Sequence, residues 1–315
     1  MLGTDGTVES HNCDYSLGGH SVTNLSDLFP SGDQPRQFRP PTFGQVINHN
    51  GRIYRIGNKI GDGAFGDVFE CTDEWANGLV AKVLRPLNRT YEEVRAEWLR
   101  ELNALAQFRH PNVTFVYDAI EHEDTFYLIL ERCEFTLNTL MTMPGYNGQQ
   151  WLPYVAGDVL QAIEFIHASG YVHKDLHAGN VFVSWVRDKM VPQKQPVWQF
   201  KVGDLGISRL ESDIDFLGTV LAQWMLPPEY LNPGEFGVVA RTTDIYHVGL
   251  LLLRMLSPDA LAFTAEDIVS GRPRQLAEQL DSPFSEAIAK ALRRHAADRT
   301  QSAIQLWRDI LAASN

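Results

Sequence analysis

Residues 170–183 read GYVHKDLHAGNVFV and set two histidines, a lysine, an aspartate and an asparagine inside an otherwise apolar run. Taken alone, the stretch fits an ordinary polar turn between a helix and a strand. Polar groups placed among core residues cost free energy unless they are hydrogen-bonded or paired. The segments before and after it therefore decide whether it is a turn or a reactive centre.

The segments around this stretch have helical patterns. Residues 151–168 carry valines and isoleucines at helical spacing, which predicts a helix that ends near Gly170. The run IYHVGLLLLRML at 245–256 is far shorter than the roughly 20 residues that cross a bilayer, so it predicts a buried helix and no membrane span. Two amphipathic runs, SEAIAKALRRHA and SAIQLWRDILAA, follow it. The second half of the chain is therefore expected to be mainly helical.

The first half has the pattern of strands. Short runs rich in Val, Ile, Phe and Tyr, such as RIYRIG, DVFECT and LVAKVL, alternate with Gly, Asn and Asp between residues 52 and 84. Two more, NVTFVYDAI and TFYLILER, lie between residues 112 and 132. Such runs predict antiparallel strands. A small β-rich lobe followed by a larger helical one is an α+β plan, and a cleft between lobes is a usual ligand site.

One helix between the strands carries a carboxylate on its apolar face. In residues 90–108, Trp98, Leu102 and Leu105 share a face at helical spacing, and Glu101 lies on the same face. An unpaired buried carboxylate would cost several kcal/mol, so Glu101 requires a cationic or hydrogen-bonding partner. Lys82, in the strand-like run LVAKVL, is the candidate.

Composition narrows the class of protein. The 315 residues have a formal net charge of −12, which disfavours nucleic acid as a partner and suits basic substrates. Three scattered cysteines favour a reducing compartment, and the N-terminus lacks the pattern of a secretory signal, so we expect a cytoplasmic location. Residues 1–44 are rich in Gly, Ser, Asn, Asp and Pro without periodicity and predict a disordered tail.

A glycine-rich motif lies between the first strands. Residues 61–68, GDGAFGDV, follow the spacing G-x-G-x-x-G-x-V. Glycines let the backbone approach phosphate groups closely, although a glycine-rich hairpin would account equally well for this motif alone. A strand follows the glycines, whereas a dinucleotide-binding fingerprint requires a helix there.

Together these motifs resemble those of the eukaryotic-type protein kinases, most nearly the serine/threonine kinases, over residues 52–311. The resemblance implies a two-lobe fold within residues 45–315, with the lobes meeting near residue 132. It also implies ATP and Mg²⁺ as cofactors. The implied catalytic residues are Lys82 on the nucleotide phosphates, Glu101 holding Lys82, and Asp175 as the base. Asn180 and Asp204 are the implied metal ligands.

The resemblance also implies which residues surround the nucleotide. They come from the glycine motif, the strand of Lys82, the run that ends in the hinge, and the strand after Asn180. They are Ile60, Gly61, Gly63, Phe65, Gly66, Val68, Val80, Lys82, Leu130, Glu131, Cys133 and Phe182.

Two features of the C-terminal half match the same family. PPEY at 227–230 resembles the end of the activation segment, and the family pairs its glutamate, here Glu229, with an arginine that matches Arg299. TTDIYHVG resembles the start of the central helix, whose aspartate, here Asp244, holds the backbone of the catalytic loop.

The chain departs from the family pattern at two positions of the catalytic loop. Lys174 stands where the family generally has arginine, and His177 stands where serine/threonine kinases usually carry lysine. We hypothesise that acidic residues of the activation segment partly replace a phosphate in pairing with Lys174. These residues are Glu211, Asp213 and Asp215.

Three functions are compatible with these motifs. The first is an ATP-dependent protein kinase acting on Ser/Thr hydroxyls of protein substrates, basic ones in view of the net charge. The second is a small-molecule phosphotransferase of the aminoglycoside or choline type, suggested by DLHAGN. The third is a pseudokinase scaffold, although every residue needed for turnover is present. The sequence leaves the oligomeric state open.

Overall fold

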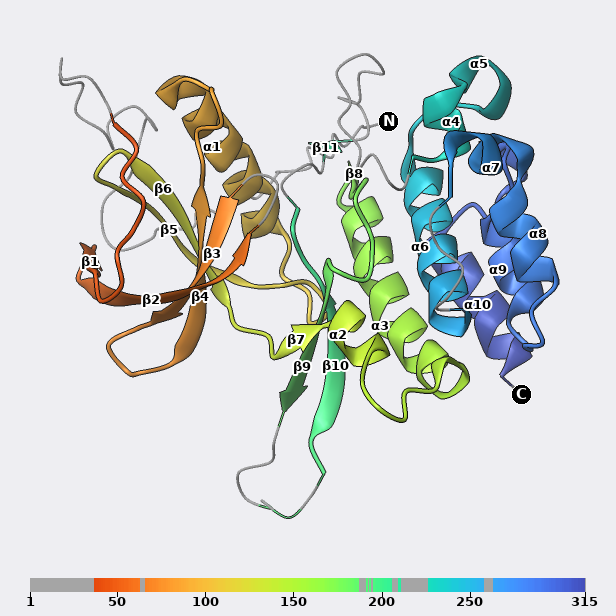
Figure 1. The fold of residues 1–315 in the computed structure, drawn as a ribbon, viewed down its shortest axis with the longest axis horizontal. Coiled ribbons are helices and arrows are strands. Elements are labelled where there is room, and N and C mark those ends of the chain that lie inside the picture. The colour runs from red at the N-terminus through yellow and green to blue at the C-terminus, as the bar shows by residue number, and fades with distance from the viewer. Residues whose placement is uncertain are drawn as a thin grey trace, which may run out of the picture. The chain divides into compact units, whose positions relative to one another are not determined.

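The computed structural model describes residues 37–62, 66–186, 191, 193, 195–205, 209–210, 226–257 and 263–314 (Figure 1). The chain separates into two units, Met1–Arg36 and Gln37–Asn315. The second unit holds all the elements described below.

A six-stranded antiparallel sheet forms the N-terminal lobe. Its strands stand in the order β1-β2-β3-β4-β6-β5. This arrangement confirms the strands expected between residues 52 and 132. The bounds are β1 Val46–His49, β2 Arg52–Asp62, β3 Gly66–Thr72, β4 Gly78–Leu84, β5 Val116–His122 and β6 Thr125–Glu131.

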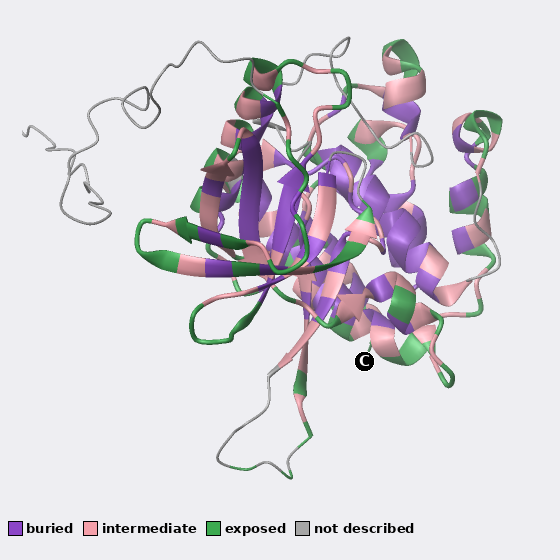
Figure 2. Cartoon of the chain, turned by 60° about the vertical axis from the view of Figure 1, so that its left-hand side comes forward, coloured by how far each residue is buried: buried purple, intermediate pink, exposed green. Residues whose placement is uncertain are grey.

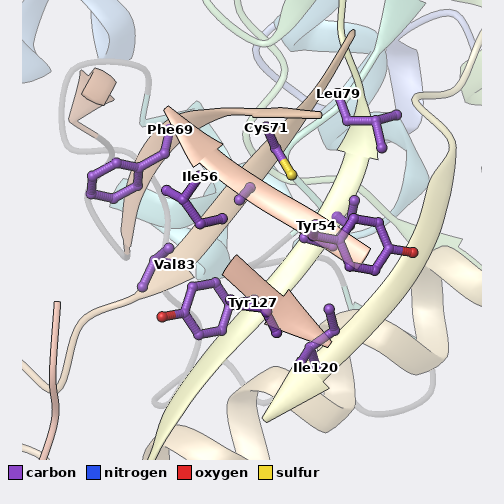
Figure 3. Close-up of a cluster of buried hydrophobic side chains, with 11 residues drawn as sticks. Tyr54, Ile56, Phe69, Cys71, Leu79, Val83, Ile120 and Tyr127 are labelled. Carbon is purple, nitrogen blue, oxygen red and sulfur yellow. The ribbon is translucent and has the colours of Figure 1, made fainter. Parts of the chain in front are cut away.

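One face of this sheet carries a hydrophobic cluster (Figure 3). Alternate residues of the strands point to the same face, so Tyr54 and Ile56 of β2 join Phe69 and Cys71 of β3. The partly buried Phe38 packs against this cluster from outside the sheet.

Residues 37–44, which the sequence assigned to the disordered tail, belong to the folded unit. Gly44 N donates to Ile56 O at 2.9 Å, and Arg39 N donates to Thr125 Oγ1 at 3.0 Å. These hydrogen bonds join residues 39 and 44 to strands β6 and β2. The partly buried Phe38, the buried Pro41 and backbone hydrogen bonds hold a segment whose composition resembles that of a tail.

Helix α1, Tyr91–Gln107, packs on the opposite face of the sheet. Thr90 and Glu93 form a capping box that satisfies the first backbone N–H groups of the helix. Trp98 is 3% exposed, and its Nε1 donates to Tyr127 O at 3.0 Å. The indole therefore fixes α1 on β6 and sets the position of Glu101, one turn further along the helix.

The C-terminal lobe is mainly helical, as expected. Its long helices are α3 Gly148–Ala168, α6 Arg241–Leu256 and α10 Ala303–Ala313. The shorter helices are α2 Leu137–Met141, α4 Pro228–Leu231, α5 Pro233–Phe236, α7 Ala265–Ser270, α8 Arg272–Glu278, α9 Ser285–Ala291 and the 3-10 turn η4 Ala296–Asp298. Short strands accompany them: β7 Phe135–Thr136, β8 Tyr171–Val172, β9 Val181–Val186, β10 Val197–Val202 and β11 Arg209–Leu210.

Helix α6 is buried on nearly every side, because it contacts α3, α8 and α9. Figure 2 shows buried residues gathered where strands and helices face one another, and exposed residues on loops and outer faces. No helix in the described part of the chain combines the length and the apolar character needed to cross a membrane.

Candidate active site

The loop between β8 and β9 lies beside the segment that follows β10. Strands β9 and β10 pair antiparallel with Val181 opposite Val202, so the residues just outside the pair, Asn180 and Gly203, become neighbours. Gly203 N donates to Asn180 O at 3.0 Å. His173 Nε2 also lies 3.2 Å from Gly203 O. The hairpin register therefore places Asp204 next to the loop that carries Asp175.

Lys82 is bound by two carboxylates. Its Nζ lies 2.7 Å from Glu101 Oε1 on α1 and 2.8 Å from Asp204 Oδ1. The first contact confirms the partner expected for Glu101, and the second joins the N-terminal lobe to the segment after β10. Asp204 adopts the left-handed φ of 56°, a conformation that aspartate tolerates better than most residues.

Lys82 remains charged at neutral pH. Burial alone would lower the pKa of Lys82, but Asp204 and Glu101 outweigh it and raise that pKa. Burial raises the pKa of Glu101, and Lys82 opposes this change. The ammonium is therefore a fixed positive charge between Glu101 and Asp204.

Asp175 has the environment of a general base. Asn180 Nδ2 donates to Asp175 O at 2.9 Å and to Asp175 Oδ2 at 3.1 Å. Burial and the nearby charge of Asp204 raise the pKa of Asp175 to about 7, against smaller opposing effects of Asn180 and Lys82. Its Oδ1 is buried and has no hydrogen-bond partner among the described residues. An acceptor oxygen with a pKa near neutrality suits proton transfer.

His177 is a neutral neighbour of Asp175. Burial lowers the pKa of His177 to about 4. Gly179 N donates to His177 Nδ1 at 3.0 Å, so the proton of the neutral ring is on Nε2, which lies 3.8 Å from Asp175 Oδ1. A Cβ at Gly179 would come within 2.7 Å of His177 Cε1, so only glycine leaves room for the ring. This position therefore offers a hydrogen-bond donor in place of the family's lysine cation.

Asp244, near the start of α6, holds the backbone of the catalytic loop, as the resemblance implied. The backbone N–H groups of His173 and Lys174 each donate to its carboxylate at 2.8 Å. His167 Nε2 lies 2.8 Å from the same carboxylate, a contact that the sequence analysis did not predict. The sequence did indicate that His167 is buried, because it lies four residues after Ile163 on the buried face of α3.

We expect Asp244→Asn to destabilise the protein by about 1–3 kcal/mol at neutral pH, because an amide nitrogen cannot accept these hydrogen bonds. Burial would raise the pKa of Asp244, but His167 and the N–H of Lys174 lower it to about 2. A depressed pKa contributes stability above the ordinary value near 3.9, and this contribution is lost as pH falls toward 2. Urea unfolding of both proteins should therefore show a difference that narrows below pH 4. A difference that stays constant with pH would contradict the assignment.

The residues expected around the base of the nucleotide lie on neighbouring strands. Val68 of β3 pairs with Lys82 of β4, and Val80 of β4 pairs with Leu130 of β6. Gly61 stands opposite Val68 across β2 and β3. Gly66 opens β3, and Ile60 on β2 is 49% exposed. The sheet therefore gathers these positions next to Lys82.

Glu131, Cys133 and Phe182 are the remaining described residues that the resemblance puts around the nucleotide. Glu131 accepts from Lys201 Nζ at 3.0 Å and from Phe115 N at 2.8 Å, so its side chain is already bound. Burial raises the pKa of Cys133 to about 12, which keeps the thiol neutral. A Cβ at Gly203 would come within 2.8 Å of Phe182 Cε2, so Phe182 packs beside the segment that carries Asp204.

Glu229 and Arg299 form the expected buried ion pair. Arg299 Nη1 and Nη2 each lie 2.9 Å from a different oxygen of Glu229, and both side chains are 0% exposed. Thr243 Oγ1 donates to Glu229 Oε1 at 2.8 Å. The pair ties α4 to the turn that precedes α10.

Some predicted residues lie outside the described part of the chain. The residues outside it are Gly63, Phe65, Glu211, Asp213 and Asp215. The last three are the acidic partners hypothesised for Lys174, which is itself buried, at 2% exposed.

Comparisons with known proteins identify the family of this chain. A family model described as "Protein kinase domain" matches residues 54–314. Mitogen-activated protein kinase 12 of Homo sapiens is 28% identical over 218 residues, covering 66% of this chain and 54% of that protein. The probable serine/threonine-protein kinase PknB of Bifidobacterium longum is 27% identical over 289 residues, covering 84% of this chain and 40% of that protein.

The chain spans about half the length of several curated relatives, among them the human kinase, at 54%. The matched residues include every element of the site, and the chain belongs to the protein kinase domain family.

Proposed function

We propose that this protein is an ATP-dependent protein kinase that transfers the γ-phosphoryl group to Ser or Thr hydroxyls of protein substrates. The observation that carries the proposal is the convergence of Lys82, Asp204 and Asp175. Lys82 Nζ lies 2.8 Å from Asp204, and both groups act electrostatically on Asp175. A fixed cation, a carboxylate and a base with a pKa near 7 suit this chemistry, which depends on positioning and charge neutralisation.

Asp175 orients the hydroxyl of the substrate and accepts its proton as the oxygen attacks the γ-phosphorus. The bond between that phosphorus and the β–γ bridging oxygen breaks, and ADP leaves. Asn180 holds Asp175 through its side-chain amide, and Lys82 binds phosphate oxygens of the nucleotide. His177 Nε2 lies 3.8 Å from the same carboxylate, beyond hydrogen-bond distance.

The residues present also fit Mg²⁺, a hard cation that prefers oxygen ligands and is usually held by one or two carboxylates plus substrate phosphates. Asp204 and Asn180 would hold it. The amide nitrogen of Asn180 is bound to Asp175, so its amide oxygen is the atom left for a cation. When bound, the ion neutralises phosphate charge.

Two observations favour this function over the alternatives. Glu229 with Arg299, and Asp244 with the loop backbone, match the protein kinase pattern that small-molecule phosphotransferases generally lack. The cluster around Lys82 is complete, which disfavours a scaffold without turnover. The net charge of −12 favours basic substrates, and the scarcity of cysteines favours a cytoplasmic location.

The test is incubation of the full chain with γ-labelled ATP, Mg²⁺ and a mixture of histones, with the Lys82→Met variant as control. We expect label on serine and threonine of the histones with the native chain and at most about 1% of that rate with the variant, because a buried charge-assisted contact is lost. Label appearing only in added amino alcohols would favour a small-molecule phosphotransferase. No transfer to any acceptor would favour a scaffold.

A further inference from the structure

A cavity of about 350 Å³ lies in the C-terminal lobe, lined by parts of α8 and of the turn between α9 and α10. The titratable groups in its lining are Arg274, Arg293, Arg294, His295, Glu278 and Asp298. None of these residues belongs to the proposed active site. Three guanidinium groups around one cavity are unusual in a chain whose net charge is −12.

Two of these arginines carry positive charge without a carboxylate partner. Arg274 is paired with Glu278 at 2.8 Å. Arg293 Nη1 donates to the backbone carbonyl of Asp298 at 2.9 Å, and Arg294 Nη1 donates to Val269 O at 2.7 Å. Among the described residues, neither Arg293 nor Arg294 lies within salt-bridge distance of an acidic side chain.

These two guanidinium groups are held in place before any ligand arrives. The carbonyls accept one N–H each from side chains that have five donors. The guanidinium carbon of Arg294 also lies 5.7 Å from the centre of the Phe236 ring. The backbone oxygens of Arg293 and Arg294 accept from Arg299 at 3.0 and 3.1 Å, which ties both residues to the buried pair with Glu229. Preorganised donors lose little conformational entropy on binding.

The chemistry of the cavity points to a phosphate monoester. Guanidinium forks bind phosphate oxygens in pairs, and a phosphorylated side chain carries about −1.5 to −2 charge at neutral pH, which matches two uncompensated arginines. A carboxylate would bring only one charge. Glu278 and Asp298 in the same lining add negative charge, so a ligand must bind through Arg293 and Arg294.

The shape points to a peptide as the carrier. A second cavity of about 300 Å³ shares Arg274, Glu278 and Arg293 with the first and continues toward Lys290 on α9. Because they share these three residues, the two cavities form one groove along α8 and α9 that is longer than a free phosphate ion needs. We propose that this groove docks a phosphorylated segment of a partner protein, with the phosphate on Arg293 and Arg294 and the flanking peptide along α8 and α9.

The test uses the full chain and a fluorescein-labelled peptide with one phosphoserine between neutral residues. Fluorescence anisotropy should show saturable binding that is at least about tenfold tighter than binding of the unphosphorylated peptide. Arg293→Gln and, separately, Arg274→Glu should each weaken binding about tenfold, the second by adding negative charge at an exposed position. Arg272→Gln on the same helix, outside the cavity lining, is the matched control and should bind as the native chain does.

Thermal unfolding of each variant shows whether it remains folded. If Arg293→Gln does not fold, Arg274→Glu still tests the proposal. Equal binding of both peptides, or no loss in the folded variants, would overturn the proposal. Inorganic phosphate competing at the same concentration as the phosphopeptide would show an ion site without a peptide groove. The measurement contains no ATP, so its outcome is separate from that of the transfer assay.

Discussion

Asp175→Asn is expected to lower the rate of phosphoryl transfer by about 100- to 10,000-fold, the range for loss of a positioned general base. The asparagine keeps the size of the side chain but cannot accept the proton of the substrate hydroxyl. The contact from Asn180 Nδ2 to the backbone oxygen of residue 175 does not depend on the side chain, so the loop should keep its shape. Nucleotide binding should therefore change little, because Lys82 keeps both carboxylate partners.

Single-turnover transfer to a protein acceptor and a separate titration with a fluorescent ATP analogue distinguish these effects. Asp281→Asn, the same chemical change at an exposed position outside the site, is the matched control. A loss of less than tenfold, or an equal loss of nucleotide affinity, would mean that Asp175 does not act as the base.

The partner of Glu101 could be predicted from two regular periodicities, that of a helix around Glu101 and that of a strand around Lys82. Helical spacing put Glu101 on the face of Trp98, and the strand pattern put Lys82 within a buried run. A carboxylate on a buried face needs a cation, and Lys82 was the one available nearby. The contact at 2.7 Å follows from that energetic requirement.

The second partner of Lys82 could not be predicted from periodicity. Asp204 is 122 residues away in sequence, and its position depends on the register of the β9–β10 hairpin and on the packing of the two lobes. The family resemblance implies that Lys82 and Asp204 act at the same nucleotide, but it did not predict a direct contact between them. Local sequence patterns do not encode such a distance.

Two other differences have local causes. The composition of residues 37–44 resembles that of a tail, yet Phe38 packs against the hydrophobic cluster of the sheet. The sequence predicts a helix over residues 151–168 but gives His167 no role, whereas its ring lies beside the carboxylate of Asp244. In both cases particular side-chain contacts outweigh the average character of the segment.

Glu229→Gln is expected to lower the free energy of unfolding by about 3–5 kcal/mol, because it leaves the guanidinium of Arg299 buried without a countercharge. Both side chains are 0% exposed, so water cannot replace the lost carboxylate. The double variant Glu229→Gln with Arg299→Met should lose less than the sum of the single changes, since it removes the charge together with its partner. Urea unfolding of the three variants measures these differences.

The exposed pair of Arg274 and Glu278 is the matched control, since it joins the same residue types at 2.8 Å but its side chains are 45% and 48% exposed. Glu278→Gln should change the unfolding free energy by no more than about 1 kcal/mol, because solvent screens such a pair. Equal effects at the two sites would contradict the role assigned to burial. The two pairs differ in geometry as well as in access to water, because Arg299 binds both oxygens of Glu229 whereas Arg274 contacts one oxygen of Glu278. The desolvated pair keeps α4 attached to the lobe, so its loss should also reduce transfer activity. Loss of the exposed pair should not.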